Sequence, residues 1–505
     1  MIVAIAVAVL FAIPVVVLRR GSLARCLTVQ IAAYAIAAIV SRQIGGFDRY
    51  LGTVALLVAQ LAIVSLFIAR ARDVRWSANR AALVALLVYA LMIPAMLRTA
   101  IDGDEPLYVL VTESVVHDRD LDLANQYRDL AHSTTGRADL RPQQGDPVGP
   151  HGEQYSRHEP FLSLLLIPGY LVARLYGALA TIAIFGALLV RSTVRMFEDE
   201  GIDDATTRAM FPLFAFAPPV VFYAARIWPE VPAAFCFVEA VRGVRSRRPQ
   251  RWLPAVFGLA LLKLRFLLVA VPLVFRSISR RTFAIALVAV VAPLAIVWIV
   301  SGSVTNVHSW HELLPAQPRV YVAGLFGLIV DGAAGLLFQA PFYILGVLAI
   351  ARWRDTPGAF RLGILSSLIY LVTLVPRAEW HGGWSPPLRY VVFLMPILAL
   401  GGATLWKSVS GGVIALIAVW SAGLVIHGAT YPYRLFQIES GENAVGEWLS
   451  RMYHSDFSRL FPSFIRTNTA AWIAMACFLA IVAIIATKRI PNPESRISIS
   501  IAAAL

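Results

Sequence analysis

Long apolar segments recur along most of this chain and constrain its fold more than any other feature. A helix needs about 20 apolar residues to cross a bilayer, and only helices and closed barrels satisfy their backbone hydrogen bonds there. We therefore expect an all-α, polytopic membrane protein. Membrane-spanning helices are predicted at residues 2–18, 24–40, 51–69, 81–97, 174–191, 209–225, 229–244, 283–301, 336–351, 361–376, 388–406, 411–429 and 469–487.

The formal net charge of +14 could indicate a nucleic-acid partner. In a polytopic protein, however, arginines and lysines gather in short cytoplasmic loops and fix the orientation of the helices. Arginines at 19–25 and 70–80 mark two such loops, which puts the polar region 98–160 on the extracytoplasmic side. That region holds 12 acidic residues and six arginines, as expected outside. We predict a multi-pass protein of the plasma or inner cell membrane, with the bilayer and no nucleic acid as its partner.

The apolar segment 252–275 is interrupted near its middle by Lys263 and Arg265, and arginines flank both of its ends. Both ends are then expected on the cytoplasmic side, which a straight span cannot satisfy. We predict a re-entrant hairpin that bends near Lys263, because irregular backbone is tolerated in a membrane where protein buries it. The remaining segments give about 13 transmembrane helices. Within 98–160, apolar residues recur at helical spacing and predict amphipathic helices on the membrane surface.

Three carboxylates follow the fourth predicted span within four residues: Asp102, Asp104 and Glu105. Ionised groups at the mouth of a span are costly and usually functional. Asp104 or Glu105 could act as a general base, and the group could also bind a divalent metal cation. The alternative is structural: Asp102 or Asp104 caps the following helix, with Pro106 in its first turn.

Polar residues at two further span ends are candidates for substrate binding. Arg157, His158 and Glu159 end the 98–160 loop, and His158 could be a metal ligand. Glu230 begins a span, close to Arg226. Interfacial residues or snorkelling ion pairs explain both groups equally well.

The outer segment 380–390 combines aromatic residues, His381 and Arg389. The aromatic side chains suit stacking on a sugar and equally suit the aromatic belt of a membrane protein. Arg389 begins a span on the outer side, where its planar guanidinium could bind a lipid phosphate.

Four stretches in order along residues 100–405 resemble bacterial membrane glycosyltransferases of the GT-C fold, related to protein O-mannosyltransferases and aminoarabinose transferases (the glycosyltransferase family 39-like group). They are Gly103 to Tyr108 with His117 to Leu123, Trp228 to Ala234, Gly327 to Asp331 with Gly335 to Leu337 and Pro341, and Gly383 to Tyr390. Leu388 stands where the family has proline before the arginine, and Arg389 itself is retained.

The resemblance implies a GT-C-like fold, a polyprenyl-phosphate sugar donor, an extracytoplasmic active site and inversion at the anomeric carbon. It implies Asp104 and Glu105 as the catalytic pair, and it brings Tyr108 and Tyr390 into the substrate site. The acceptor would be a lipid, a glycan or a protein. We expect extra helices at 1–80, a catalytic module at 81–430, and an outer segment, last helix and basic cytoplasmic tail at 431–505.

Two other classes of membrane protein are alternatives to a transferase. A lipid-linked glycan polymerase or ligase would share the outer polar loop but would not require the acidic pair. A transporter should show internal repeats and spans broken near the midplane, and only 252–275 fits that pattern.

Overall fold

The structure is a computed structural model that describes residues 77–143, 146–149, 151–276, isolated helical positions between 284 and 298, and 318–487. Within these ranges the protein is helical and contains no strand, so the predicted all-α class is confirmed. The spans predicted at 2–18, 24–40 and 51–69, and most of 283–301, lie outside the described residues.

The helices fall into three groups along the chain. The first group is α4 (Ala78–Met96), α5 (Glu105–His117), α6 (Ala124–Arg128) and α7 (Phe161–Asp199). The second group is α8 (Asp204–Phe216), α9 (Val220–Tyr223), α10 (Glu230–Arg245), α11 (Pro249–Leu262) and α12 (Leu267–Arg276). The third group is α14 (Pro318–Val330), α15 (Leu336–Gln339), α16 (Ile344–Ala349), α17 (Gly358–Leu374), α18 (Met395–Leu405), α19 (Gly411–Thr430), α20 (Ala444–Tyr453) and α21 (Thr469–Thr487).

Five of the described helical stretches are long and apolar enough to cross a membrane: Ala78–Met96, Phe161–Asp199, Arg389–Ser408, Gly411–Thr430 and Thr469–Thr487. A sixth would be the pair Pro341–Asp355 and Gly358–Leu374, which is bent by 113°. Four of the five coincide with predicted spans to within three residues at each end, because each is an apolar run with few breaks. Phe161–Asp199 contains the predicted span 174–191 and extends beyond it at both ends. The total of about 13 stays a prediction, as does the division at residues 80 and 430.

Prolines shorten two other predicted spans. The segment 209–225 divides into α8 and α9 because Pro218 and Pro219 lie between them, and proline donates no backbone hydrogen bond. The segment 336–351 divides into α15 and α16 around Pro341. These pieces are shorter than the length that a single crossing needs.

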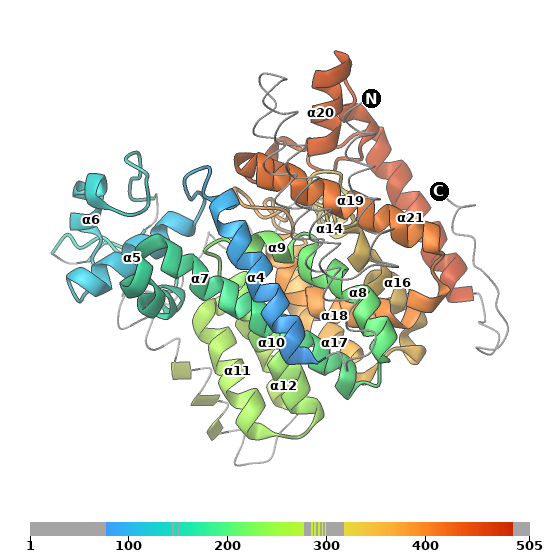
Figure 1. Cartoon of the computed structure of the whole chain (residues 1–505), viewed down its shortest axis with the longest axis horizontal. Coiled ribbons are helices and arrows are strands. Elements are labelled where there is room, and N and C mark those ends of the chain that lie inside the picture. Colours follow the sequence, from blue (N-terminus) through green and yellow to red (C-terminus); the bar gives the residue numbers. More distant parts are fainter. Residues whose placement is uncertain are drawn as a thin grey trace, which may run out of the picture.

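The re-entrant segment is broken where the sequence predicted. Helix α11 ends at Leu262, Lys263 has extended backbone, and α12 starts at Leu267 after one turn of 3-10 helix. The two helices contact each other and lie side by side (Figure 1). The break is confirmed, while the cytoplasmic placement of both ends stays a prediction.

Helix α10 is central to the packing, in contact with α7, α11, α12, α17 and α18 (Figure 1). Helix α7 is kinked at Ala173 and Arg174, which have non-helical backbone angles. A Cβ added to Gly177 would lie only 1.8 Å from the carbonyl oxygen of Gly169, so the chain can double back here only because both residues are glycine. The kink separates a short entry helix from the long span, as the sequence predicted for 160–170.

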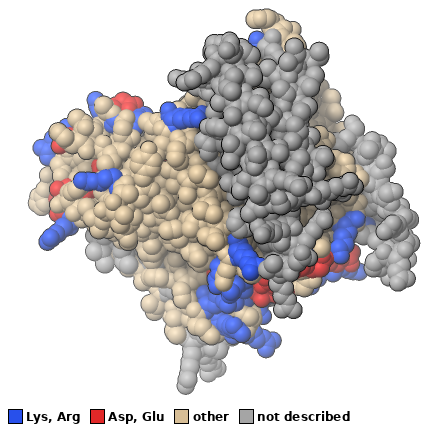
Figure 2. Space-filling model, viewed as in Figure 1, with Lys and Arg blue, Asp and Glu red and all other residues tan. Residues whose placement is uncertain are grey.

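The surface of the described residues fits a membrane protein. On α4, Leu83, Leu87 and Leu91 form an exposed apolar stripe at i, i+4 and i+8. Figure 2 shows charged side chains gathered around the α5–α6 end and at the lower end of the view, with a broad uncharged surface between them. Such a band is what lipid tails would cover.

The predicted sidedness can be tested with single cysteines at His132 and Arg247, both exposed, in a background where Cys26, Cys236 and Cys477 are serine. A membrane-impermeant maleimide added to sealed inside-out vesicles should label Arg247→Cys and not His132→Cys; spheroplasts should give the reverse. Detergent permeabilisation should make both sites reactive, as a control. Labelling of both sites from one side would contradict the topology.

Candidate functional site

The predicted acidic stretch joins α4 to α5 through a tight turn. Gly103 has φ +64°, and a Cβ there would lie 2.5 Å from the carbonyl oxygen of Trp384, so glycine is required by both conformation and space. Asp104 is the N-cap residue of α5, but its side chain makes no capping hydrogen bond. Asp104 therefore occupies the N-cap position that the structural alternative predicted, but its side chain does not cap the helix.

Asp104 lies among cationic and basic groups from three distant segments. Its Oδ2 accepts a short hydrogen bond from Nη2 of Arg389, and it lies 3.8 Å from both Lys263 Nζ and His158 Nε2. Burial alone would raise the pKa of Asp104, but these neighbours, Arg389 foremost, hold it well below its usual range. The carboxyl group is therefore ionised at neutral pH.

Glu105 points away from this cluster and is completely buried. Its two oxygens accept hydrogen bonds from Arg226 Nη1 at 2.9 Å and from the backbone N–H of Ile227 at 2.7 Å. The backbone N–H of Asp102 adds a third at 3.2 Å. Burial raises the pKa of Glu105, and these donors oppose the rise. The two acids that the sequence paired thus have different environments: Glu105 anchors the start of α5 to the turn before α10.

Glu230 links Arg389 to the break between α11 and α12. Its Oε1 accepts from Arg265 Nη2 at 2.5 Å and from Arg389 Nε at 3.4 Å. The guanidinium of Arg389 also stacks over Trp228 at 4.3 Å, and that of Arg265 over Tyr390 at 4.7 Å. Stacking fixes the planes of both guanidinium groups, so Arg389 is held with one edge toward Asp104.

Lys263 and the end of the outer loop complete the cluster. Lys263 Nζ lies 3.2 Å from the hydroxyl of Tyr108 and 3.4 Å from His158 Nδ1. Glu159 accepts from the backbone N–H of Leu264 at 2.9 Å. Burial lowers the pKa of His158 to about 3, so its imidazole is neutral. His158 Nε2, Glu159 Oε2 and Glu230 Oε2 are buried without a hydrogen-bond partner among the described residues, which is typical of groups that meet a ligand.

The structure thus brings together Asp104, Tyr108, His158, Glu230, Arg389 and Tyr390 from the predicted site residues. Lys263 and Arg265 were interpreted only as markers of topology, although two cations in an apolar segment are themselves a functional signal. Arg226 was noted beside Glu230, but its contact with Glu105 was not predicted.

The other predicted site residues lie apart from the cluster. Asp102 forms an ion pair with Arg137 at 2.7 Å. Arg157 forms one with Asp146 at 3.0 Å. His381 accepts a local hydrogen bond from the backbone N–H of Gly383 at 3.3 Å. These contacts hold loops, and none of them reaches Asp104.

Helix α5 forms as predicted, but protein covers it. Residues Glu105 to Ser114 are buried, and α5 packs on α7. Glu113 holds the returning loop by accepting hydrogen bonds from Thr134 and Ser133. The helix is therefore part of the protein interior and not an open amphipathic helix on the membrane surface.

The residues do not assemble as a metal site. Among the residues that the structure describes, no group of three potential ligands surrounds a common point. Of the predicted ligands Asp104, Glu105 and His158, Glu105 is turned toward Arg226, and Asp104 already faces Arg389 and Lys263. A divalent cation at Asp104 would meet those two positive charges, so these residues fit a metal ion poorly.

Comparison with known proteins adds no relative: the chain matches no family model, no curated protein and no solved structure. A function for this chain must therefore be argued from its own residues.

The pair Glu105–Arg226 should dominate local stability. Removing one member of a buried ion pair leaves the other uncompensated, which costs about 3–5 kcal/mol. We expect Glu105→Gln and Arg226→Met each to lower the free energy of unfolding by about that amount, and the double variant to lose less than the sum. Denaturant unfolding in micelles measures all three. Strictly additive losses, or single losses below about 1 kcal/mol, would contradict the coupling.

Proposed function

We propose that this protein is a membrane-embedded glycosyltransferase that moves a sugar from a polyprenyl-phosphate donor to an acceptor hydroxyl on the extracytoplasmic face, with inversion. The observation that carries the proposal is the partly buried, ionised Asp104, held against Arg389 with Lys263 3.8 Å away. A general base lies there beside two cations, the two functions that sugar transfer from a phosphate requires. The four sequence stretches that resemble GT-C glycosyltransferases support the same chemistry.

The cations would bind the donor phosphate. Arg389 offers a planar guanidinium oriented by Trp228, and Lys263 offers a compact charge 3.8 Å from the same carboxylate oxygen of Asp104. In this buried setting they would stabilise the negative charge that the leaving polyprenyl phosphate gains. Tyr108, hydrogen-bonded to Lys263, would orient that ammonium.

Asp104 would act as the base. The acceptor oxygen attacks the anomeric carbon from the face opposite the phosphate, and its proton passes to Asp104. The carbon–oxygen bond to the phosphate breaks, and its electron pair leaves with the phosphate. The configuration therefore inverts. Glu105 is the poorer candidate because both its oxygens are bound by Arg226 and Ile227.

The ion pair with Arg389 would also regulate the strength of the base. While Arg389 is paired with Asp104, the low pKa of that carboxylate makes it a weak proton acceptor. Once the donor phosphate attracts the guanidinium, burial would dominate and raise the pKa of Asp104. Donor binding would thereby activate the base.

The catalytic assignment is tested by Asp104→Asn. Purified protein is given radiolabelled polyprenyl-phosphate sugars and membrane extract as a source of acceptor, and released polyprenyl phosphate is measured. We expect one donor to support turnover and Asp104→Asn to lower it by about 10²–10⁴-fold. The exposed Asp118→Asn, at the other end of α5, is the matched control and should keep full activity. Full turnover by folded Asp104→Asn would refute the role.

The pH dependence follows from the lowered pKa values. Asp104 and His158 stay deprotonated above their depressed pKa values, so kcat/KM should stay level from about pH 8 to pH 5. Arg389→Gln removes the largest lowering influence, so the base form of Asp104 should be lost at a higher pH as acid is added. The acid limb of that variant should then enter the measured range. An unchanged profile in Arg389→Gln would contradict the coupling.

A further inference from the structure

A cavity lined by both apolar and polar residues lies next to the turn that carries Asp104, and the proposed chemistry leaves it unused. It has a volume of about 240 Å³. Its walls come from the outer end of α19, the loop that carries Trp384, and residues 434–447. The residues that line it include Trp384, His427, Arg434, Glu439, Glu442 and Glu447.

The cavity adjoins the acidic turn through Trp384. The backbone of Trp384 packs against Gly103, and its indole lies near the carboxylate of Asp102. Phe436, next to the cavity wall, packs on the Trp384 ring and receives the guanidinium of Arg226 at 5.0 Å. A ligand in the cavity would therefore lie against residues that flank Asp104.

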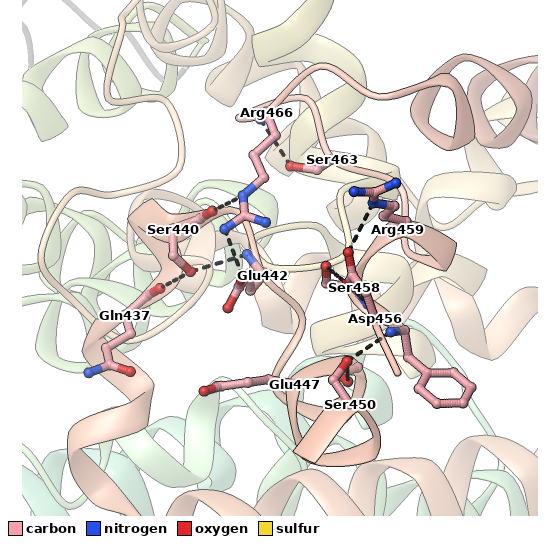
Figure 3. A network of polar contacts seen from close by, with 12 residues as sticks. Gln437, Ser440, Glu442, Glu447, Ser450, Asp456, Ser458, Arg459, Ser463 and Arg466 are labelled. Carbon is pink, nitrogen blue, oxygen red and sulfur yellow. Dashed lines mark hydrogen bonds and ion pairs between the residues drawn. The ribbon is translucent and has the colours of Figure 1, made fainter. Parts of the chain in front are cut away.

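The arginines near the cavity are already neutralised. Arg434 pairs with Glu447, and Arg466 pairs with Glu442 at 2.7 Å. Figure 3 shows Arg466 joining Ser440, Glu442 and Ser463 in one network. Such a rim has no surplus positive charge, so the cavity is poorly suited to a phosphate.

The remaining polar groups of the cavity are suited to hydroxyl ligands. Among the described residues, no cation lies within ion-pair distance of Glu439. His427 Nε2 is buried and has no hydrogen-bond partner among the described residues. Trp384, 45% exposed, offers an aromatic face at the wall. Carboxylate and imidazole acceptors beside an aromatic ring can hold the hydroxyls and the apolar face of a sugar.

We propose that this cavity binds a neutral hexopyranose ring of the acceptor, which makes the acceptor a glycan or glycolipid. The inference rests on the proposed glycosyltransferase function. The size agrees, because about 240 Å³ is below the ~300–1,000 Å³ of pockets for drug-sized ligands. The sugar ring would then be recognised next to the turn 102–104, close to the cations that would bind the phosphate.

The test measures sugar binding without donor. The full-length protein is placed in lipid nanodiscs, because glycoside detergents would compete. Saturation-transfer difference NMR is recorded with the methyl glycosides of glucose, mannose, galactose and N-acetylglucosamine. We expect a signal from at least one of them, reduced about five-fold or more in Trp384→Ala and in Glu439→Gln. Inorganic phosphate should not compete.

One variant and one competitor locate the signal. Arg459→Gln alters an exposed ion pair with Asp456 in the same segment (Figure 3) and should leave the signal unchanged. Polyprenyl phosphate, which would occupy the charged cluster, should not displace the glycoside. Displacement by polyprenyl phosphate would place the sugar in the donor site and overturn the inference.

The two proposals can fail separately. The absence of a signal from all four glycosides, or a signal that Trp384→Ala does not change, would overturn the proposal that the cavity binds the acceptor. Turnover of the donor could persist in either case. A signal sensitive to Trp384→Ala in a protein that releases no polyprenyl phosphate would support the sugar site and refute the transferase.

Discussion

The ion pair between the partly buried Asp104 and the buried Arg389 is the interaction on which this site depends. An unpaired ion inside a helical bundle costs several kcal/mol, so each of the two charges stabilises the other. Arg389 reaches Glu230, and Glu230 reaches Arg265, so one chain of charges ties the starts of α5 and α10 to the break between α11 and α12. The irregular backbone at Lys263 is stabilised by the same network.

The network of ion pairs stabilises the fold but weakens Asp104 as a base. Pairing gives each carboxylate a cation and keeps the interior neutral, but a carboxylate held by arginine is a poor base. Among the residues that the structure describes, one atom each of His158, Glu159 and Glu230 is buried without a hydrogen-bond partner. An anionic group entering here could take over Arg389 and leave Asp104 ionised beside it. This exchange is what the proposed transferase would require.

The sequence predicted the unbroken helices well and the site in part. The span predicted at 469–487 coincides with α21, because a continuous apolar run decides both. The spans predicted across Pro218 and Pro341 were too long. The helices end near these prolines because of local backbone geometry, which the apolar pattern does not reveal. Asp104 and Arg389 could be found because each is a charge at a span end. The separation of Glu105 from Asp104 could not, because it is set by Arg226, 121 residues away.

The turn at Gly103 explains why two different surfaces can meet at one carboxylate. Because a Cβ at Gly103 would collide with the backbone of Trp384, the loop that carries Trp384 lies directly on the turn. A base that removes a proton from an acceptor must face the acceptor, while the cations must face the leaving phosphate. The short turn holds Asp104 beside Arg389 and Lys263 and next to the loop of Trp384. Groups for both tasks are therefore gathered around one carboxylate before any substrate binds.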